Sequence, residues 1–278
     1  MNAQKTCLSM LIALAAMVLP AHASELASAK VTAITGSVTL STAGGQDVPL
    51  SIGQILKEGD SISVTALSQV KLVFSNGSEL TVEENSSVKL TTLRQEAFAG
   101  NQAYEQLEAD PSKSQTLLEL NYGELRGHVK KLQKGSKFFI QTPLGTAAIR
   151  GTRFTVKLSY SALRGEFKLT VNNIDGLVDI LTNHTEQLAF EENLGDNYDD
   201  SGTSEDTPVP IPSNDSITIR IDKSDPQFDT ILNTIQDIIP QGLDTLVVTP
   251  GGIDGNDGGD GGDGDFPIQV VSPDGPQQ

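Results

Sequence analysis

The first half of the chain alternates apolar and polar residues in short runs bounded by glycine and other turn residues. Alternate side chains of a strand face opposite sides, so a period of two predicts strands, whereas an amphipathic helix repeats every 3.6 residues. We therefore predict that residues 30–90 form short strands. The predicted strands are 31–34, 38–40, 55–56, 62–64, 70–74, 80–82 and 88–90.

Two segments of the chain, Asn76-Gly77 and residues 95–114, predict a turn and a loop between the strands. Asn76-Gly77 lies between two alternating runs, and both residues tolerate positive φ, which predicts a hairpin or a tight β-arch. Residues 95–114 lose the alternation and contain Asp110-Pro111. We predict an inserted loop there, with a short helix near 103–107 that ends before the proline.

Alternation resumes after this loop and continues to about residue 190. The predicted strands are 117–122, the region of Leu125 and Val129, 138–141, 147–149, 154–158, 167–171 and 177–181. Residues 24–190 are therefore predicted to form one all-β domain, which is long enough to enclose a hydrophobic core.

The last third of the chain has a different composition. Residues 191–215 are acidic and rich in Asn, Asp, Ser and Pro, so they bury too little apolar surface to fold alone, and we predict a linker. Residues 250–278 are mostly Gly, Asp and Pro, and we predict a disordered tail.

Between them, residues 216–249 are predicted to form a small strand-helix appendage. Ile217, Ile219 and Ile221 alternate as a strand. An apolar stripe then recurs at helical spacing, and we predict a helix with Ser224 as its N-cap and Pro240 at its end. The stripe either packs on the β-domain or binds a partner. Its residues are Phe228, Ile231, Leu232, Ile235 and Ile238.

The chain begins with the features of a secretory signal peptide, which we assign to residues 1–23. Lys5 precedes an apolar run at 8–19, and Ala21-His22-Ala23 fits an A-x-A cleavage site. We expect cleavage near Ala23 and a mature protein in the periplasm or outside the cell. The run is shorter than the about 20 residues of a membrane-spanning helix, so we expect no transmembrane segment in the mature chain. Cleavage would remove Cys7, the single cysteine, which excludes disulfides and thiol chemistry.

Charge is distributed unevenly along the chain. Of 36 acidic residues, 19 follow residue 190, where Arg220 and Lys223 are the only basic residues; the other 17 are balanced by 17 basic residues. A near-neutral body with an acidic tail argues against nucleic acid as a partner, because phosphate binding needs an excess of Lys and Arg.

One segment of the body is basic throughout. Nine Lys and Arg residues and no acidic residue occur between Glu124 and Glu166. We expect either ordinary solvated side chains or a positive surface that binds an acidic partner, the chain's own acidic tail included. Arg150 either bonds carbonyls or a carboxylate inside the domain or faces a cleft as an anion site. The candidate binding residues are Lys130, Lys131, Lys134, Lys137, Arg150 and Arg153.

Five motifs in order carry a resemblance to a known family. They are GSVTL at Gly36, GQILKEGDSIS, VKLVFSNGSELTV, GELRGHV with FFIQTPLGTAAIRGTRFTV, and IDGLVDI at Gly176. Together they resemble the FecR-domain family over about residues 30–180. The resemblance implies an all-β fold, either β-helix-like or a roll of short strands. Members that resemble the founding regulator are periplasmic domains that receive a signal from an outer-membrane transporter and pass it through a membrane helix to a sigma factor.

This chain departs from that arrangement, because a cleavable signal replaces the membrane helix and the cytoplasmic segment. We therefore expect a stand-alone exported module for non-enzymatic recognition or signalling in the cell envelope, binding a protein or a surface polymer. The alternative is a secreted structural or adhesion component with a weakly calcium-associating tail.

Candidate chemistry is sparse. The tail has one GGxGxD match, and its carboxylates are weak calcium candidates, because the apolar residue that such repeats need is replaced by Asp265. They are Asp257, Asp260, Asp263 and Asp265. His128 and His184 lie in no metal-ligand spacing, no nucleophile motif is present, and Glu83-Glu84 are strand neighbours that point to opposite faces. We expect no enzyme activity and no cofactor.

Overall fold

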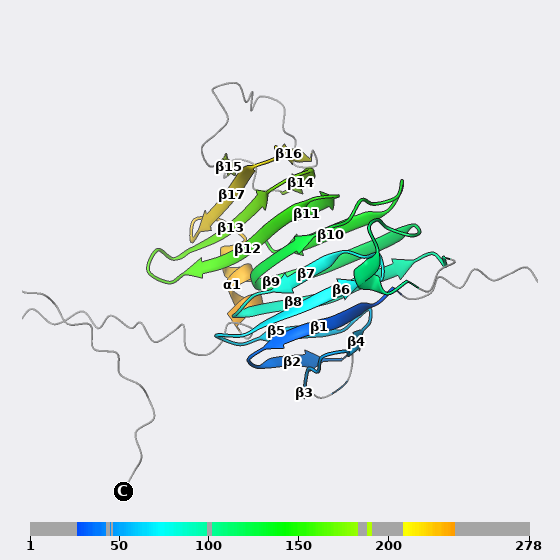
Figure 1. Ribbon diagram of the computed structural model, residues 1–278. Coiled ribbons are helices and arrows are strands. Elements are labelled where there is room, and N and C mark those ends of the chain that lie inside the picture. Colours follow the sequence, from blue (N-terminus) through cyan, green and yellow to red (C-terminus); the bar gives the residue numbers. More distant parts are fainter. Residues whose placement is uncertain are drawn as a thin grey trace, which may run out of the picture. The chain divides into compact units, whose positions relative to one another are not determined.

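The computed structural model describes residues 27–42, 45, 47–98, 102–182, 188–190 and 208–236, all within one compact unit. The predicted signal peptide, most of the predicted linker and the predicted tail lie outside the described residues. The described part is mostly strands with one short α-helix, which confirms the all-β prediction (Figure 1).

The described strands pair into one open, mixed sheet. It has two halves, called sheet A and sheet B below, and the strand β9 (Ser114–His128) belongs to both. Sheet A has the order β3 (Val48–Pro49), β2 (Val38–Ser41), β5 (Ser61–Val64), β8 (Ser86–Gln95), β9, β10 (Lys137–Thr142), β11 (Gly145–Arg150), β14 (Leu177–Leu181) and β16 (Val209–Ile211). Sheet B has the order β4 (Ile55–Leu56), β1 (Ala29–Thr35), β6 (Gln69–Phe74), β7 (Glu79–Val82), β9, β12 (Arg153–Ser161), β13 (Glu166–Asn173), β17 (Asp215–Asp222) and β15 (Leu188–Phe190). The β9–β10 pair is parallel and the other pairs are antiparallel.

The strand β9 bends at Gly123 to pass from one sheet to the other. Before this glycine it pairs with β8 and β10, and after it with β7 and β12. Gly123 has φ of 99°, and a Cβ there would lie 2.5 Å from the Ser86 Cα, so only glycine fits. The Asn76 side chain, in the turn that leads to β7, reaches Ser114 at the start of β9, so both ends of β9 lie at the same end of the domain.

The two sheets enclose one hydrophobic core. Inward-facing residues of the strands alternate with partly exposed ones, as the period of two predicts. The Phe138 ring of sheet A lies 5.7 Å from the Phe74 ring and 6.4 Å from the Phe154 ring, both of sheet B, measured between centroids. Such aromatic contacts fix the two inner faces against each other.

The hairpin predicted at Asn76-Gly77 is confirmed. It joins β6 to β7, and Gly77 has φ of 83°. The Asn76 side-chain oxygen accepts a hydrogen bond from the Ser78 backbone N–H at 3.0 Å, which closes the turn. In the following loop, the predicted helix is a single 3₁₀ turn, η1 (Tyr104–Gln106), tied to β1 by an ion pair between Lys30 and Glu105.

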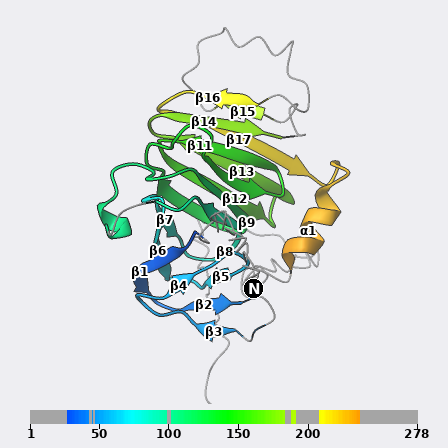
Figure 2. The same ribbon diagram turned by 90° about the vertical axis from the view of Figure 1, so that its right-hand side faces the viewer.

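The strand and helix after residue 215 belong to the same core. The strand β17 pairs with β13 along its full length, and the helix α1 (Phe228–Gln236) lies at the end of sheet B where β17 finishes (Figure 2). The Phe228 ring lies 5.2 Å from the Phe167 ring, so the apolar stripe packs on the β-domain.

The predicted start of this helix was wrong. It begins at Phe228, and Asp225, not Ser224, accepts hydrogen bonds in the preceding turn, through its backbone carbonyl from Phe228 and through its carboxylate from Gln227. The Ser224 hydroxyl donates to the Asp222 carboxylate and lies four residues before Phe228, too early in the chain to cap this helix. Ile238 and Pro240 lie outside the described residues.

Candidate functional site

A groove of about 300 Å³ lies between the loop 131–136 and the end of β11. It is at the end of the domain where β9 begins and ends. Three of its lining side chains are cationic and exposed. The lining residues are Lys131, Leu132, Gln133, Lys134, Gly135, Ser136, Arg150 and Gly151.

A buried carboxylate holds the loop side of this groove. The Asp110 side chain is only 3% exposed and accepts hydrogen bonds from the hydroxyl groups of Ser136 at 2.6 Å and Ser114 at 2.9 Å. The Asp110 backbone N–H donates to the Lys131 carbonyl at 3.0 Å, and its carbonyl accepts from the Gln133 side chain at 3.2 Å. Four contacts therefore place the loop before any ligand binds.

The opposite side of the groove is held by the turn from β11 to β12. Gly151 has φ of 61°, which lets the chain reverse directly after Arg150. Thr152 is fully buried, and its hydroxyl donates to the Asn173 side-chain oxygen at 2.9 Å. This fixed turn leaves the Arg150 side chain exposed at the rim of the groove, which favours the cleft alternative for this residue.

The six predicted basic residues separate into two groups. Lys130 forms an ion pair with Glu79 at 3.4 Å, and Arg153 forms one with Asp175 at 3.6 Å. Lys131, Lys134 and Arg150 line the groove, and Lys137 begins the strand that follows it. None of these four has an ion pair with another residue that the structure describes.

One further cation, Lys113, lies against the loop that lines the groove and was not predicted. A Cβ at Gly135 would lie 3.1 Å from Lys113 Cε and 3.7 Å from its Nζ, so this side chain lies against the loop. Lys113 precedes the basic segment in sequence, separated from it by Glu119 and Glu124. Lys113 therefore cannot be recognised as part of the basic surface from the run of charges in the sequence. It lies near Gly135 in the folded domain because the neighbouring Ser114 donates a backbone hydrogen bond to the Ser136 side chain.

One comparison with known proteins bears on the family. Residues 60–178 match the family model described as FecR protein. This match confirms the resemblance to a FecR domain over these residues. The match begins after β4, so the first four strands lie outside it, although β1 and β2 pair with β6 and β5 of the matched region.

Solved structures show only a weak likeness to the chain. Two crystal structures of a proposed anti-sigma factor from Parabacteroides distasonis ATCC 8503 resemble it with 15% sequence identity and TM-scores of 0.36 and 0.34. The matches cover 61% and 62% of this chain and only 62% and 63% of those chains. At these TM-scores the likeness carries no conclusion for this chain. No curated protein matches the sequence significantly.

The FecR match supports a regulatory module of the cell envelope. The charged residues that line the groove are Lys131, Lys134 and Arg150. Among the described residues, no group of three or more His, Cys, Asp and Glu side chains could hold a metal, and no helix is long and apolar enough to cross a membrane. The four calcium candidates of the tail lie outside the described residues.

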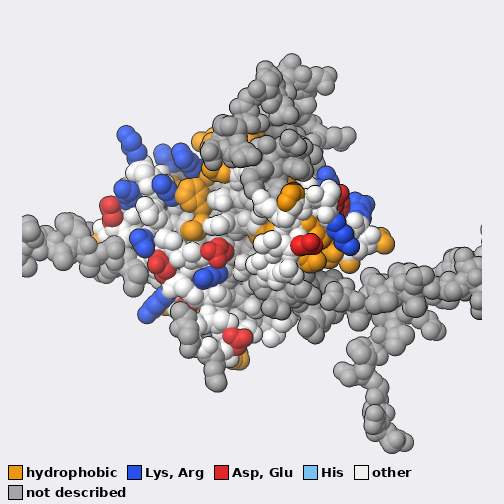
Figure 3. Space-filling model, turned by 180° about the vertical axis from the view of Figure 1, so that it is seen from behind, with side chains coloured by type: hydrophobic (Ala, Val, Ile, Leu, Met, Phe, Trp, Pro, Cys, Tyr) orange, Lys and Arg blue, Asp and Glu red, His pale blue; other side chains and the backbone are white. Residues whose placement is uncertain are grey.

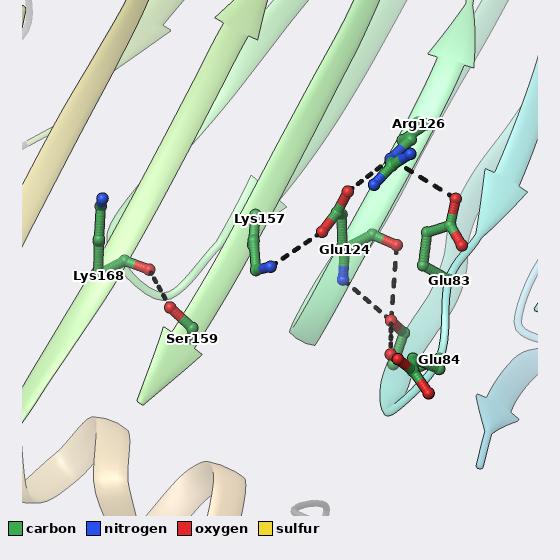
Figure 4. A network of polar contacts seen from close by, with 8 residues as sticks. Glu83, Glu84, Glu124, Arg126, Lys157, Ser159 and Lys168 are labelled. Carbon is green, nitrogen blue, oxygen red and sulfur yellow. Dashed lines mark hydrogen bonds and ion pairs between the residues drawn. The ribbon is translucent and has the colours of Figure 1, made fainter. Parts of the chain in front are cut away.

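A second polar cavity, of about 390 Å³, lies at the other end of the FecR domain, where β9 bends. Figure 4 shows its ion pairs: Glu124 bonds to Arg126 at 2.6 Å and to Lys157 at 3.1 Å, and Arg126 also contacts Glu83 at 3.5 Å. Burial alone would raise the pKa of Glu124, but the hydrogen bonds from Arg126 and Lys157 outweigh burial and lower it. Acids and bases here neutralise one another, so this cavity offers less net charge to a ligand than the groove does.

The pKa of His128, at the end of β9 near the groove, is lowered by burial and by neighbouring positive charges. Burial lowers the pKa of this imidazole, and the neighbouring charges of Lys130 and Arg153 lower it further, against the opposing effect of Glu79 and Asp175. The side chain is therefore neutral at pH 7 and adds no charge of its own.

Proposed function

We propose that this FecR domain is a non-enzymatic recognition module of the cell envelope that binds an acidic ligand, on a protein or a surface polymer, at the groove of Lys131, Lys134 and Arg150. One observation carries the proposal: these three cations line a preformed groove without an ion pair to any described residue. A cation that is not neutralised by its own protein can attract an acidic partner at long range and pair with it on contact.

The proposal includes export of the chain, with cleavage near Ala23. The basis is the predicted signal peptide together with the envelope role of FecR domains. N-terminal sequencing of the protein from fractionated cells tests this part. A mature chain that begins at Ser24 in a periplasmic or extracellular fraction supports it, and an uncleaved cytoplasmic chain contradicts it.

Binding at the groove is tested with fluorescent poly-glutamate and the full chain. We expect the triple variant Lys131→Gln, Lys134→Gln, Arg150→Gln to bind about tenfold more weakly at low salt, since exposed pairs contribute roughly 0.2–1 kcal/mol each. The affinity of the unmodified chain should fall as salt is raised, because salt screens exposed charges.

The matched control removes three exposed lysines elsewhere, with Lys57→Gln, Lys71→Gln and Lys223→Gln. It lowers the net charge by the same amount and should keep more affinity than the groove variant. Equal losses in the two triple variants would show that only net charge matters, and the proposed site would be wrong.

The chain's own acidic residues are a competing ligand. Deletion of residues 237–278 removes acidic residues of the predicted tail and leaves every described residue in place. If the tail occupies the groove, this deletion should increase the affinity for poly-glutamate at low salt. An unchanged affinity would contradict docking of the deleted residues in the groove.

A further inference from the structure

Two large apolar side chains are exposed next to the basic groove. Ile174 is 46% exposed in the turn between β13 and β14, and Leu177 is 65% exposed at the start of β14. Leu177 is the direct antiparallel partner of Arg150. Directly opposed residues of an antiparallel pair project from the same face of the sheet, so Leu177 stands beside the Arg150 side chain.

The turn that carries these side chains is rigid. The Asn173 side-chain amide donates to the carbonyls of Gly176 at 3.2 Å and Ile211 at 2.7 Å. The Asp175 carboxylate accepts from the Arg153 backbone N–H at 2.6 Å, and the Ile174 N–H donates to the Arg153 carbonyl at 2.9 Å. These bonds tie the turn both to the β11–β12 turn at the groove and to β16.

The backbone packing of this turn is equally close. Gly176 has φ of 84°, and a Cβ there would lie 2.4 Å from the Gly151 carbonyl oxygen. The turn of Ile174 therefore sits directly against the turn that follows Arg150. Ile174 and Leu177 are held in fixed positions relative to the groove, without being buried by the contacts that fix them.

An exposed apolar side chain in a fixed position, next to cations without an ion pair, can contact a partner segment that is both apolar and acidic. Exposed Leu or Ile side chains that occur singly need no explanation. Here Leu177 is the direct strand partner of Arg150, and Ile174 lies in the turn that packs against Gly151. Preformed positions reduce the conformational entropy that these side chains of the domain lose when a partner binds. Figure 3 shows one face of the molecule, on which Lys and Arg side chains gather at one end next to hydrophobic side chains.

We infer that the partner is a protein segment in which an apolar side chain is flanked by Asp and Glu residues. The apolar side chain covers Leu177 and Ile174, and the carboxylates pair with Arg150, Lys131 and Lys134. This inference rests on the proposed function, because it uses the same groove, and it narrows the ligand to a peptide. An acidic polymer without apolar groups could pair with the cations but would leave the two apolar side chains exposed to water.

The test compares short fluorescent peptides that bind the full chain, with anisotropy as the measurement. One peptide is rich in Asp and Glu with a central Phe, the second replaces this Phe with Ser, and the third keeps the Phe but replaces the acids with Asn and Gln. We expect the first peptide to bind at least about fivefold more tightly than each of the others, as for other interface hot spots.

The decisive variant is Leu177→Ala, and the matched control is Leu163→Ala. Leu163 is 92% exposed in the turn between β12 and β13, outside the groove and its turn. Leu177→Ala should weaken binding of the acidic Phe peptide about fivefold or more and leave the Ser peptide unchanged, whereas Leu163→Ala should change neither. Both variants remove exposed side chains, so equal unfolding temperatures will show that the fold is intact.

The outcomes separate the inference from the proposed function. If the two acidic peptides bind equally, or if Leu177→Ala behaves like Leu163→Ala, the inferred contact with Leu177 and Ile174 is wrong. The proposal that the basic groove binds an acidic ligand is not contradicted by this result. If poly-glutamate binds as tightly as the acidic Phe peptide, the ligand is an acidic polymer and the inference is overturned. If the triple groove variant binds every acidic probe as well as the unmodified chain, both proposals fail.

Discussion

The Asp110 carboxylate accepts a hydrogen bond from the Ser136 hydroxyl group at 2.6 Å, across 26 positions of the sequence. This contact ties the loop before β9 to the loop after it, and Ser114 donates to the same carboxylate oxygen at 2.9 Å. Nothing in the local sequence marks this carboxylate as structural, yet it determines where the groove lysines stand.

Replacing Asp110 with Ala should destabilise the domain by about 1–3 kcal/mol, because two buried hydroxyl groups lose their acceptor. Chemical denaturation measures the loss in the free energy of unfolding. Hydrogen exchange should also show faster exchange in residues 131–136. The control is Glu108→Ala, an exposed acid of the same loop, which should change stability by less than about 0.5 kcal/mol. Equal effects of the two variants would contradict a structural role for Asp110.

A comparison of Gly176 with Gly53 separates the cost of a steric contact at the Cβ position from the cost of a positive φ. They have nearly equal φ, 84° and 85°, but a Cβ at Gly176 would meet the Gly151 oxygen, whereas at Gly53 nothing lies within 4 Å. Gly53→Ala should cost about 1–2 kcal/mol from its positive φ alone. Gly176→Ala should cost roughly 1–3 kcal/mol more, because the turn must also move away from Gly151. Equal losses on thermal unfolding would mean that the contact carries no energy.

The ion pairs of Glu124 make stability depend on acid pH. Its pKa is lowered in the folded state from the usual 4.5, so the unfolded state binds protons first as the pH falls. The stabilisation is therefore complete above pH 4.5 and is lost as the pH falls through the lower folded-state pKa. Glu124→Gln should reduce the difference in unfolding free energy between pH 6 and about pH 3, measured by denaturation. A pH profile that keeps its full slope in this variant would contradict the role of these pairs. Glu96→Gln, at an exposed position, is the control.

His128 should contribute in a different pH window. Its folded-state pKa lies below the usual 6.5, so the neutral form is favoured in the folded protein. Stability should therefore fall as the pH drops from 6.5 through the folded-state pKa, and His128→Asn should remove this component. Denaturation at closely spaced pH values measures the slope. A slope between pH 7 and about pH 5 that is unchanged in the variant would show that His128 does not cause it.

Most strands could be predicted because they have one buried face, which leaves a period of two in the sequence. The strand β3 was not predicted, because both of its residues are exposed, and β16 lies in the segment predicted to be a linker. The Asn76-Gly77 hairpin could be predicted from its turn residues. The continuity of β9 could not, because Gly123 interrupts the pattern in the same way as a glycine that ends a strand. The parallel pairing of β9 with β10 also leaves no local signal, because it depends on how the chain returns through the groove loop.

For the candidate site, the basic segment could be identified from the sequence. Which of its side chains form ion pairs and which line the groove could not. Lys130 and Arg153 differ from Lys131 and Arg150 only because Glu79 and Asp175 reach them in the folded domain. Lys113 was missed for the converse reason, since it joins the groove from another part of the chain. The helix start was misplaced because Ser224 belongs to a turn before the helix, in which Asp225 accepts the hydrogen bonds from Gln227 and Phe228.

The passage of β9 through both sheets makes each sheet depend on the other for its folding. Each sheet uses one half of this strand as its middle member, so neither sheet is a complete unit if the chain is divided at Gly123. A fragment that ends at Gly123 lacks the second half of β9 and therefore leaves sheet B without its middle strand. The groove is thus expected to form only when the whole domain folds.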